Sequence, residues 1–255
     1  MKYHNTTTIL GIDFFKGEVT EVVDLLKNGG LLVVPAAPAL ITIINDQKYY
    51  QSLQDADIII PDSGYMTMIW NFLKKEKIKR ISGLEFLISF INSYDIKAQG
   101  EFLIIDPKQV DADLNIEYLR KHNFIIAKEA SYVAPMYKKD DITDIILLKL
   151  IEQMKPKYVL INLGGGVQEK LGAYLKNNLS YSPAIICTGA AIAFLTGVQA
   201  KIPSWADKYY LGWLFRCFKN PNLYVPRYIK AFKLAIIMLR YGKNSPVVSL
   251  PATVL

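Results

Sequence analysis

Short apolar runs alternate with amphipathic stretches through the first 200 residues, and this alternation constrains the fold more than any other feature. The apolar runs are rich in Val and Ile and predict strands, whereas the stretches between them have the spacing of one helix face. Strands that are apolar throughout and alternate with helices are typical of a parallel sheet covered on both faces. The expected strands are 9–14, 31–35, 57–61, 102–106, 124–128, 158–163 and 184–188, and the expected helices are 18–28, 37–53, 65–74, 84–91, 115–121, 144–154 and 167–176.

The last 55 residues have a different character, because the strand pattern stops and basic residues accumulate. Residues 201–255 hold nine Lys and Arg against one Asp, in a chain whose net charge is +7. Residues 203–219 and 221–240 predict two helices separated at Asn220. We therefore expect an α/β body over 1–200, a basic aromatic helical appendage over 201–242 and an irregular tail over 243–255.

A basic and aromatic segment is typical of a surface that binds polyanions such as phospholipid headgroups, diphosphates or nucleic acid. The alternative is a solvated helix face above a core-facing aromatic stripe. The segment matches no known nucleic-acid-binding platform, so we expect no nucleic-acid partner. The longest uncharged run, 177–200, is long enough to raise the question of a transmembrane helix. Polar residues and Pro183 interrupt it, which favours a buried strand, a loop and a helix.

The number of cysteines and the start of the chain indicate the cellular compartment of the protein. Cys187 and Cys217 are too few for a disulfide framework, and no long apolar run follows the basic start. These features predict a cytosolic protein, either soluble or peripheral to a membrane, without a signal peptide.

The first candidate functional residue is Asp62, which follows an apolar strand directly. In doubly wound sheets, ligands bind beyond the carboxyl ends of the strands. A half-buried carboxylate there could act as a general base. Alternatively, Asp62 or Ser63 could cap the following helix, and the local sequence by itself favours the cap.

The second candidate is a triple glycine, Gly164, Gly165 and Gly166, between a strand and a helix. Glycines let the backbone approach a phosphate, and a helix N-terminus offers N–H groups, although a tight strand-to-helix connection explains the glycines equally well. The dinucleotide fingerprint is missing because Glu169 stands where its third glycine belongs, which disfavours a nucleotide-dependent oxidoreductase. Gln168 and Glu169 could hydrogen-bond sugar hydroxyls or serve the first helical turn.

The third candidate is the turn at Thr188 and Gly189, where small residues allow a ligand close to the backbone. Cys187, just before it, is expected to be a buried apolar residue, because no histidine partner is available for nucleophilic catalysis. Two Asp-Ala-Asp triplets, 55–57 and 111–113, have the spacing of a metal site, but neither stands directly after a strand. We therefore expect neither a bound metal nor a cofactor.

Taken together, these segments resemble the WecG/TagA/CpsF family of bacterial glycosyltransferases, in register from about residue 31 to residue 228. The resemblance depends on an ordered series of motifs rather than on a single one. The best segments are Ala56-Asp-Ile-Ile-Ile-Pro-Asp62, Arg80-Ile-Ser-Gly-Leu-Glu85, residues 157–169, Thr188-Gly-Ala-Ala-Ile-Ala-Phe-Leu-Thr-Gly197, Lys201-Ile-Pro-Ser-Trp205 and Gly212-Trp-Leu-Phe-Arg216, with Asn220-Pro221 and Arg227-Tyr228 at the expected spacings.

The resemblance implies a hexosyl- or N-acetylhexosaminyltransferase of surface polysaccharide synthesis. It would move a sugar from a UDP-sugar to a polyprenyl-diphosphate-linked acceptor, with inversion and without a bound metal, on the inner face of the cell membrane. Asp62 matches the residue proposed as the family's catalytic base, which changes the preferred interpretation of this residue from cap to base. Gln168 and Glu169 match a Gln-Glu pair in the donor loop, and Arg216 and Arg227 match arginines that the appendage adds to the site.

Several family positions carry other residues here, so fewer polar groups are available to contact the sugar. These positions are Ala36, Ser63, Gly166, Val167, Ile192, Ala193, Gly212 and Leu223. Donor identity is therefore not carried over, and the alternative is a non-catalytic or weakly active member that acts as a membrane-surface subunit of a transferase complex. The sequence also leaves the oligomeric state open, so a homo-oligomer stays among the partners considered.

Overall fold

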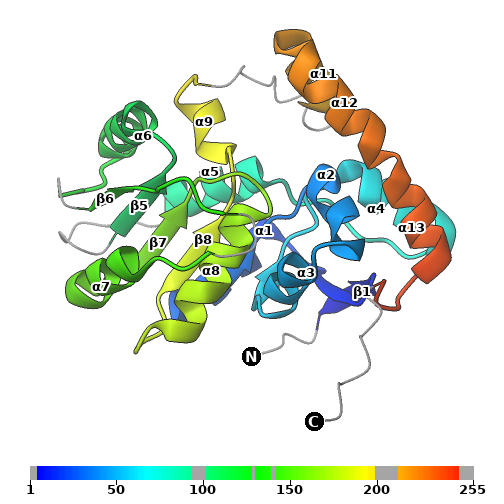
Figure 1. The fold of residues 1–255 in the computed structure, drawn as a ribbon, viewed down its shortest axis with the longest axis horizontal. Coiled ribbons are helices and arrows are strands. Elements are labelled where there is room, and N and C mark those ends of the chain that lie inside the picture. The colour runs from blue at the N-terminus through cyan, green and yellow to red at the C-terminus, as the bar shows by residue number, and fades with distance from the viewer. Residues whose placement is uncertain (1–4, 94–101, 128–129, 139–141, 199–211, 247–255) are drawn as a thin grey trace.

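The computed structural model describes residues 5–93, 102–127, 130–138, 142–198 and 212–246. Within them, six strands pair in parallel in the order β4-β3-β8-β7-β5-β6 (Figure 1). The strands are β3 (Gly30–Val33), β4 (Ile58–Ile59), β5 (Phe102–Asp106), β6 (Ser131–Val133), β7 (Tyr158–Ile161) and β8 (Ala184–Cys187). The prediction of a parallel α/β sheet with a helical segment at the C-terminal side is thus confirmed.

Helices cover both faces of this sheet. One face packs against α1 (Val19–Leu25), η1 (Leu26–Asn28), α5 (Gly83–Ser93), α6 (Gln109–Lys121) and α9 (Ala191–Leu195). The other packs against α3 (Gln47–Gln54), α4 (Gly64–Lys74), α7 (Ile145–Met154) and α8 (Val167–Asn178). Alternate strand residues enter the two cores: Leu31 and Val33 face the second layer, whereas Leu32 and Val34 face the first. This double burial explains why the strands are apolar throughout.

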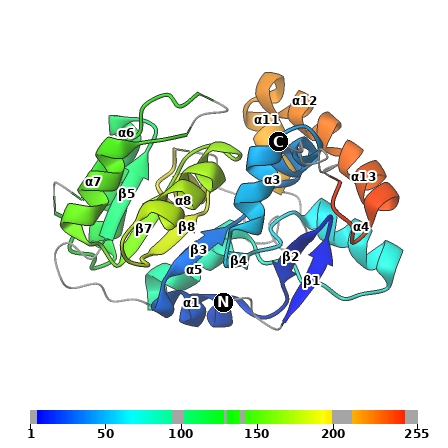
Figure 2. The same cartoon turned by 60° about the horizontal axis from the view of Figure 1, so that its bottom comes forward.

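The expected strand 9–14 is wrong, because the chain turns in its middle. β1 (Thr6–Ile9) and β2 (Ile12–Phe15) form an antiparallel hairpin, a separate two-stranded sheet in which β2 lies beside β4 (Figure 2). The two turn residues, Leu10 and Gly11, both have positive φ, of 55° and 72°. Two residues with positive φ form the tight turn that suits the twist of a hairpin. Leu10 rarely adopts this conformation, so the local sequence carried little sign of the turn.

Two other expected elements differ in detail. The helix expected over 37–53 is divided into α2 (Ala37–Leu40), η2 (Ile41–Ile44) and α3, because Asp46 caps α3 by accepting a hydrogen bond from the Tyr49 N–H. The strand expected over 124–128 is wrong for its described part, since residues 124–127 are irregular and β6 begins at Ser131. There the Arg120 side chain donates to the Ile126 carbonyl at 2.8 Å, in place of a strand partner.

The described residues 212–246 form three helices: α11 (Gly212–Lys219), α12 (Pro221–Ala231) and α13 (Lys233–Tyr241). The break at Asn220 is as predicted, but a further break at Phe232 divides the second expected helix. In Figure 1, α12 and α13 still run on almost continuously. The boundary expected at residue 200 lies outside the described residues. None of the helices in the described ranges is both long and apolar enough to cross a membrane.

The last of these helices belongs to the core of the body. Leu234, Ile237 and Met238 of α13 are buried in the same cluster as the sheet residues. Beyond α13, the carbonyls of Gly242 and Lys243 accept hydrogen bonds from Leu10 and Gly11 in the hairpin turn, both at 2.9 Å. The hairpin therefore holds the end of α13 against the body.

Candidate functional site

The carboxyl ends of four neighbouring strands bring the predicted residues of the body to one edge of the sheet. Asp62 follows β4, α2 follows β3, Thr188 follows β8 and the triple glycine follows β7. Since β4, β3, β8 and β7 are consecutive in the sheet, these segments lie in the same order along its edge. This edge is the place where parallel sheets bind ligands.

Asp62 does not cap α4. Ser63 caps it instead, since Ser63 Oγ accepts a hydrogen bond from the Met66 N–H at 3.1 Å. Asp62 Oδ1 accepts a hydrogen bond from the N–H of Gly83, the first residue of α5, at 3.1 Å. Within the described residues, Asp62 Oδ2 accepts no hydrogen bond, and the side chain is 26% exposed. A carboxylate fixed through one oxygen and open at the other can accept a proton from a bound hydroxyl.

Arg80 is a site residue to which the sequence analysis gave no role. Its Nη2 lies 3.5 Å from Asp62 Oδ1, and its Nε donates to the main-chain oxygen of Asp62 at 2.7 Å. The pattern Ser-x-x-Glu at Ser82 and Glu85 could have revealed the helix start beside it, because each side chain accepts from the other's N–H. No local signal could have linked Arg80 to Asp62.

Gly83 connects Asp62 with the centre of the sheet edge. A Cβ on Gly83 would lie 3.2 Å from Val34 Cγ1 and 3.6 Å from the Thr188 carbonyl oxygen. The start of α5 therefore packs closely against the ends of β3 and β8. Asp62 accepts a hydrogen bond from Gly83, and the Thr188 carbonyl lies close to the open side of the same glycine, so Gly83 connects the first and third predicted positions.

The triple glycine forms an open loop before α8. A Cβ on Gly164 or Gly166 would meet no atom within 4 Å, and one on Gly165 would lie 3.5 Å from the Cβ of Ala39 in α2. The Gly166 N–H is already used, since it donates to Glu169 at 2.6 Å. No described residue accepts a hydrogen bond from the N–H groups of Gly164 and Gly165. Two backbone donors just before α8 are thus left without a partner among the described residues.

Gln168 and Glu169 are buried, 2% and 0% exposed, and they tie two loops together. Gln168 Oε1 accepts from the Gly189 N–H at 2.8 Å, while its Nε2 lies 3.2 Å from Glu169 Oε1. Burial raises the pKa of Glu169, although the hydrogen bonds from Gln168 and Gly166 oppose this effect. Of the two roles left open by the sequence, serving the first turn is the one visible here. Direct contact with a sugar stays a prediction.

Thr188 and Gly189 follow β8 and lie in the central part of the edge. Thr188 Oγ1 is buried and has no hydrogen-bond partner among the described residues, and Gly189 adopts a positive φ of 61°. Cys187 is fully buried, and burial raises the pKa of its thiol well above the usual value. Cys187 is thus the buried apolar residue that was expected.

A second group missed by the sequence analysis lies under the glycine loop. Asp106, at the end of β5, is fully buried and accepts hydrogen bonds from Asn115 of α6 at 2.7 Å and from Asn162 at 2.9 Å. Burial raises the pKa of Asp106 to about 6, although the two amide hydrogen bonds oppose it. Asn162 directly precedes the loop, so Asp106 links that loop to β5 and α6. The only sequence signal for this group was that a polar residue, Asp106, ends an apolar strand.

The appendage helices lie next to this edge. α12, which carries Arg227, packs against α2, and α2 borders the glycine loop through Ala39. α13 packs against α4 and η2, and Tyr65 of α4 contacts Phe232 with ring centroids 5.3 Å apart. Arg216 lies in α11. The side chains of both arginines lie outside the described residues, so their part in the site stays a prediction.

The acidic triplets do not form a cluster. Asp57 pairs with Lys176 at 2.7 Å and accepts from the Leu31 N–H at 2.8 Å, which fixes β4 beside β3. Asp113 accepts from Gln109 within α6. Over the described ranges, no three His, Cys, Asp or Glu side chains gather into a group that could hold a metal ion.

Comparison with known proteins finds similar sequences. The sequence model of the Glycosyl transferase WecG/TagA/CpsF family matches residues 7–246. A protein of Bacillus spizizenii (strain ATCC 23059 / NRRL B-14472 / W23) is 26% identical over 242 residues, which cover 89% of this chain and 90% of that protein. Staphylococcus aureus proteins of strains MRSA252 and MW2 are 22% and 23% identical, and cover 82% and 83% of this chain and 82% and 84% of their own lengths. All three are named N-acetylglucosaminyldiphosphoundecaprenol N-acetyl-beta-D-mannosaminyltransferase.

Proposed function

Because the chain belongs to the WecG/TagA/CpsF family of glycosyl transferases, we propose that it moves an N-acetylhexosamine from a UDP-sugar to a polyprenyl-diphosphate-linked acceptor. The names of its relatives make N-acetylglucosaminyl-diphosphoundecaprenol the first acceptor to test and N-acetylmannosamine the first sugar to transfer. The observation that carries the proposal is the position of Asp62 at the carboxyl end of β4, fixed through Oδ1 and open at Oδ2.

In the proposed reaction, Asp62 takes the proton from an acceptor hydroxyl as its oxygen attacks the anomeric carbon. The new glycosidic bond forms on the face opposite the leaving group, which inverts the configuration. The bond between the anomeric carbon and the diphosphate oxygen breaks, and UDP leaves with the electron pair. A positioned base of this kind typically contributes about 10²–10⁴-fold to the rate.

The leaving diphosphate needs positive charge and hydrogen-bond donors. The free N–H groups of Gly164 and Gly165, at the N-terminus of α8, provide donors on the open side of the loop. Arg216 and Arg227 on the adjacent helices would add the charge without a metal ion. Gln168 and Glu169 support this arrangement by fixing the loop against Gly189.

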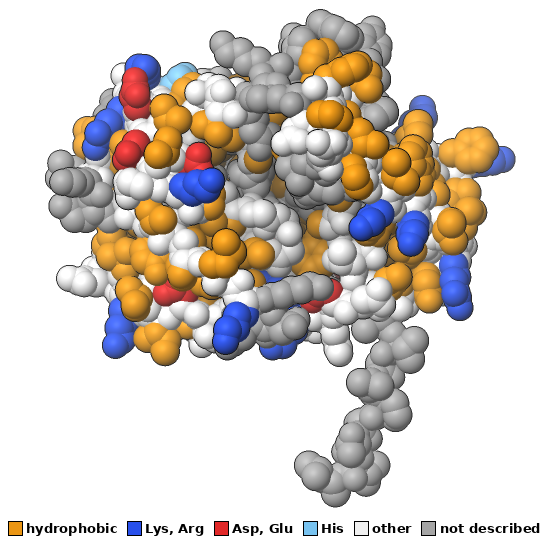
Figure 3. All heavy atoms as spheres, turned by 45° about the horizontal axis from the view of Figure 1, so that its top comes forward, with side chains coloured by type: hydrophobic (Ala, Val, Ile, Leu, Met, Phe, Trp, Pro, Cys, Tyr) orange, Lys and Arg blue, Asp and Glu red, His pale blue; other side chains and the backbone are white. Residues whose placement is uncertain are grey.

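We further propose that the enzyme binds peripherally to the anionic inner face of the cell membrane. An exposed apolar stripe runs along α12 and α13, formed by Val225, Ile229, Phe232, Ile236 and Leu239 at spacings of three and four residues. On the face drawn in Figure 3, hydrophobic side chains and Lys or Arg side chains lie together over the side that holds α4, α12 and α13. Each basic residue near an anionic surface is worth about 1 kcal/mol.

The function is tested by incubating the enzyme with UDP-N-acetylmannosamine and a soluble acceptor that carries N-acetylglucosamine on a lipid diphosphate. Release of UDP together with the glycosylated acceptor, and inverted stereochemistry by NMR, is the expected result. The reaction is repeated with EDTA, which should leave the rate unchanged. If no UDP-sugar in a panel gave acceptor-dependent release of UDP, this result would contradict the proposal.

A further inference from the structure

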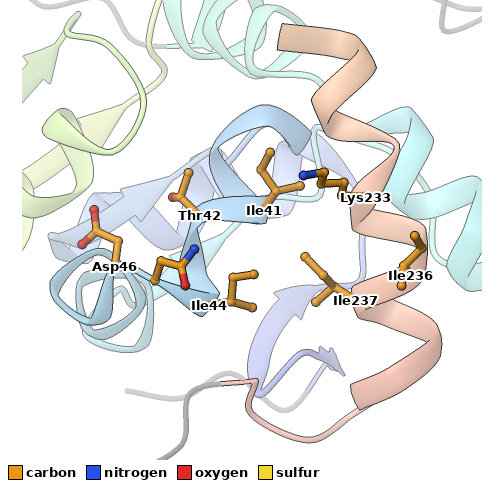
Figure 4. A pocket seen from close by; sticks show the side chains of 8 residues that line it. Ile41, Thr42, Ile44, Asp46, Lys233, Ile236 and Ile237 are labelled. Carbon is orange, nitrogen blue, oxygen red and sulfur yellow. The ribbon is translucent and has the colours of Figure 1, made fainter. Parts of the chain in front are cut away.

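A pocket of about 460 Å³ lies between η2 and α13, outside the edge described above (Figure 4). Ile41 and Ile44 line it from η2, and Ile236 and Ile237 line it from α13. This volume falls within the range of roughly 300–1,000 Å³ that small-molecule pockets occupy. Its walls are largely aliphatic, so its occupant should be apolar over most of its length.

The charges around the pocket are unequal. Asp46 lines one end, but it forms a buried ion pair with Lys170 of α8 at 2.8 Å, and both side chains are 7% exposed. Lys233 lines the other end, and within the described part of the chain no acidic group pairs with it. In Figure 4 its ammonium group points across the pocket toward Ile41. The pocket therefore combines apolar walls with one uncompensated positive charge, which suits a hydrocarbon chain with an anionic head.

The pocket is continuous with the exposed apolar stripe of α12 and α13. Ile236 belongs to both, since it lines the pocket and is 66% exposed. If the stripe lies on a bilayer, a lipid chain can pass along Ile236 from the membrane into the pocket.

At its other side the pocket lies next to the proposed reaction site. Lys233 directly follows Phe232, whose ring packs against Tyr65, and Tyr65 lies in the first turn of α4 just after Asp62. Thr42, also in the lining, donates to the carbonyl of Ala39, which borders the glycine loop. The pocket thus lies between the proposed membrane-facing surface and the elements that carry the proposed base and donor loop.

We propose that this pocket holds the first isoprenoid units of the lipid-linked acceptor, with Lys233 binding the acceptor diphosphate at its rim. The inference rests on the proposed function, because it takes the acceptor to be a polyprenyl diphosphate. It goes further by assigning the lipid its own binding site in the protein, so that part of the chain leaves the bilayer before the sugar reaches Asp62.

The kinetic test compares two soluble acceptors that share an N-acetylglucosaminyl diphosphate head, one with a farnesyl tail and one with an ethyl tail. Ile44→Gln should raise KM for the farnesyl acceptor by about tenfold, as expected for loss of an apolar pocket contact. It should leave KM for the ethyl acceptor unchanged. Ile44 is absent from the stripe, so membrane binding does not enter the comparison. Ile88→Gln on α5 is the matched control, because both side chains are 41% exposed.

Lys233→Gln should raise KM for both acceptors, because both carry the diphosphate, whereas Lys230→Gln outside the pocket should change neither. The enzyme could instead use both acceptors and still have the lower KM for the farnesyl acceptor after Ile44→Gln. That result would overturn the inference and leave the proposed function intact. Failure to use either acceptor with any UDP-sugar would instead count against the proposed function.

A second readout does not depend on turnover. Farnesyl diphosphate with a diazirine on its terminal isoprene unit is photolysed with the full-length protein, and the labelled peptides are identified by mass spectrometry. Label is expected on residues 41–46 and 233–237, with several-fold less incorporation in Ile44→Gln than in Ile88→Gln. Labelling confined to other segments, or unaffected by Ile44→Gln, would overturn the inference.

Discussion

Arg80 holds Asp62 at two points, with Nε donating to its main-chain oxygen at 2.7 Å and Nη2 lying 3.5 Å from Oδ1. The guanidinium group can do both because its donors are arranged in a planar fork. The carboxylate is therefore fixed in position and orientation before any substrate arrives. Such fixing is what a general base needs, because small displacements lower the rate of proton transfer.

Asp62→Asn should lower kcat by about 10²–10⁴-fold while the fold is kept, because the amide cannot take the proton but its oxygen can still accept from Gly83. Initial rates of UDP release measure the effect, and the melting temperature checks the fold. Asp113→Asn, at an exposed acid of α6, is the control. A turnover near that of the unchanged enzyme would remove Asp62 from the mechanism.

Arg80→Lys should lower kcat by about tenfold, since a lysine cannot make both contacts at once and the carboxylate loses part of its orientation. Arg80→Gln should lower it further. KM for the donor should change little in either variant, because the contacts described for Arg80 are with Asp62, whereas the donor loop follows β7. Equal kcat values for Arg80→Lys and the unchanged enzyme would show that the position of Asp62 does not depend on Arg80.

Adding one methyl group at two places in the donor loop should have two different effects. At Gly166, where φ is +89°, alanine should destabilise the fold by about 1–2 kcal/mol, because side chains rarely adopt this conformation. At Gly164, alanine should leave stability nearly unchanged, since its Cβ enters open space, but should raise KM for the UDP-sugar. Denaturant titration and donor kinetics separate the two effects. A donor KM unchanged in Gly164→Ala would place the diphosphate elsewhere.

Asp106 should make the stability of the protein depend on pH. Its pKa is raised from 3.8 to about 6, so the folded chain holds this proton more tightly than the unfolded chain. The stabilisation is complete below about pH 4 and is lost as pH rises through about 6, by up to about 3 kcal/mol. Asp106→Asn, which stays neutral, should lose this slope, whereas Asp113→Asn should keep it. Urea titrations across this range measure the free energy of unfolding, and equal slopes in all three proteins would refute the prediction.

Replacing Ile229 and Leu239 together with Gln should weaken binding to vesicles of phosphatidylcholine and phosphatidylglycerol by at least about tenfold. A large aliphatic side chain contributes roughly 1.5–3 kcal/mol when fully buried, and both are exposed in the free protein. The matched control replaces Ile145 and Ile146 of α7, which are similarly exposed on another helix. Vesicle sedimentation measures binding, which should also fall with added salt. Equal loss in both double variants would show that the stripe is not the contact.

Most of the elements, and the place of the site, could be predicted because their signals are local. The strands that form β3, β4, β5, β7 and β8 are apolar runs bounded by turn residues, and the carboxyl ends of β4 and β7 marked Asp62 and the glycine loop as candidates. The hairpin was missed because its turn depends on positive φ at Leu10, which no sequence rule assigns to leucine. Arg80 was missed because it lies 18 positions after Asp62, and the residues between them carry no sign that the two segments meet.

The sequence by itself determined the alternation of most strands and helices, the apolar character of both sheet faces and the basic character of the C-terminal segment. These properties depend on residue type and short-range spacing. The tertiary structure decided which strand ends adjoin, that Gln168 and Glu169 are buried between two loops, and that α13 shares the core of the body. The reason is physical: neighbouring parallel strands are joined only through long crossovers, so their pairing depends on contacts between segments far apart in the chain.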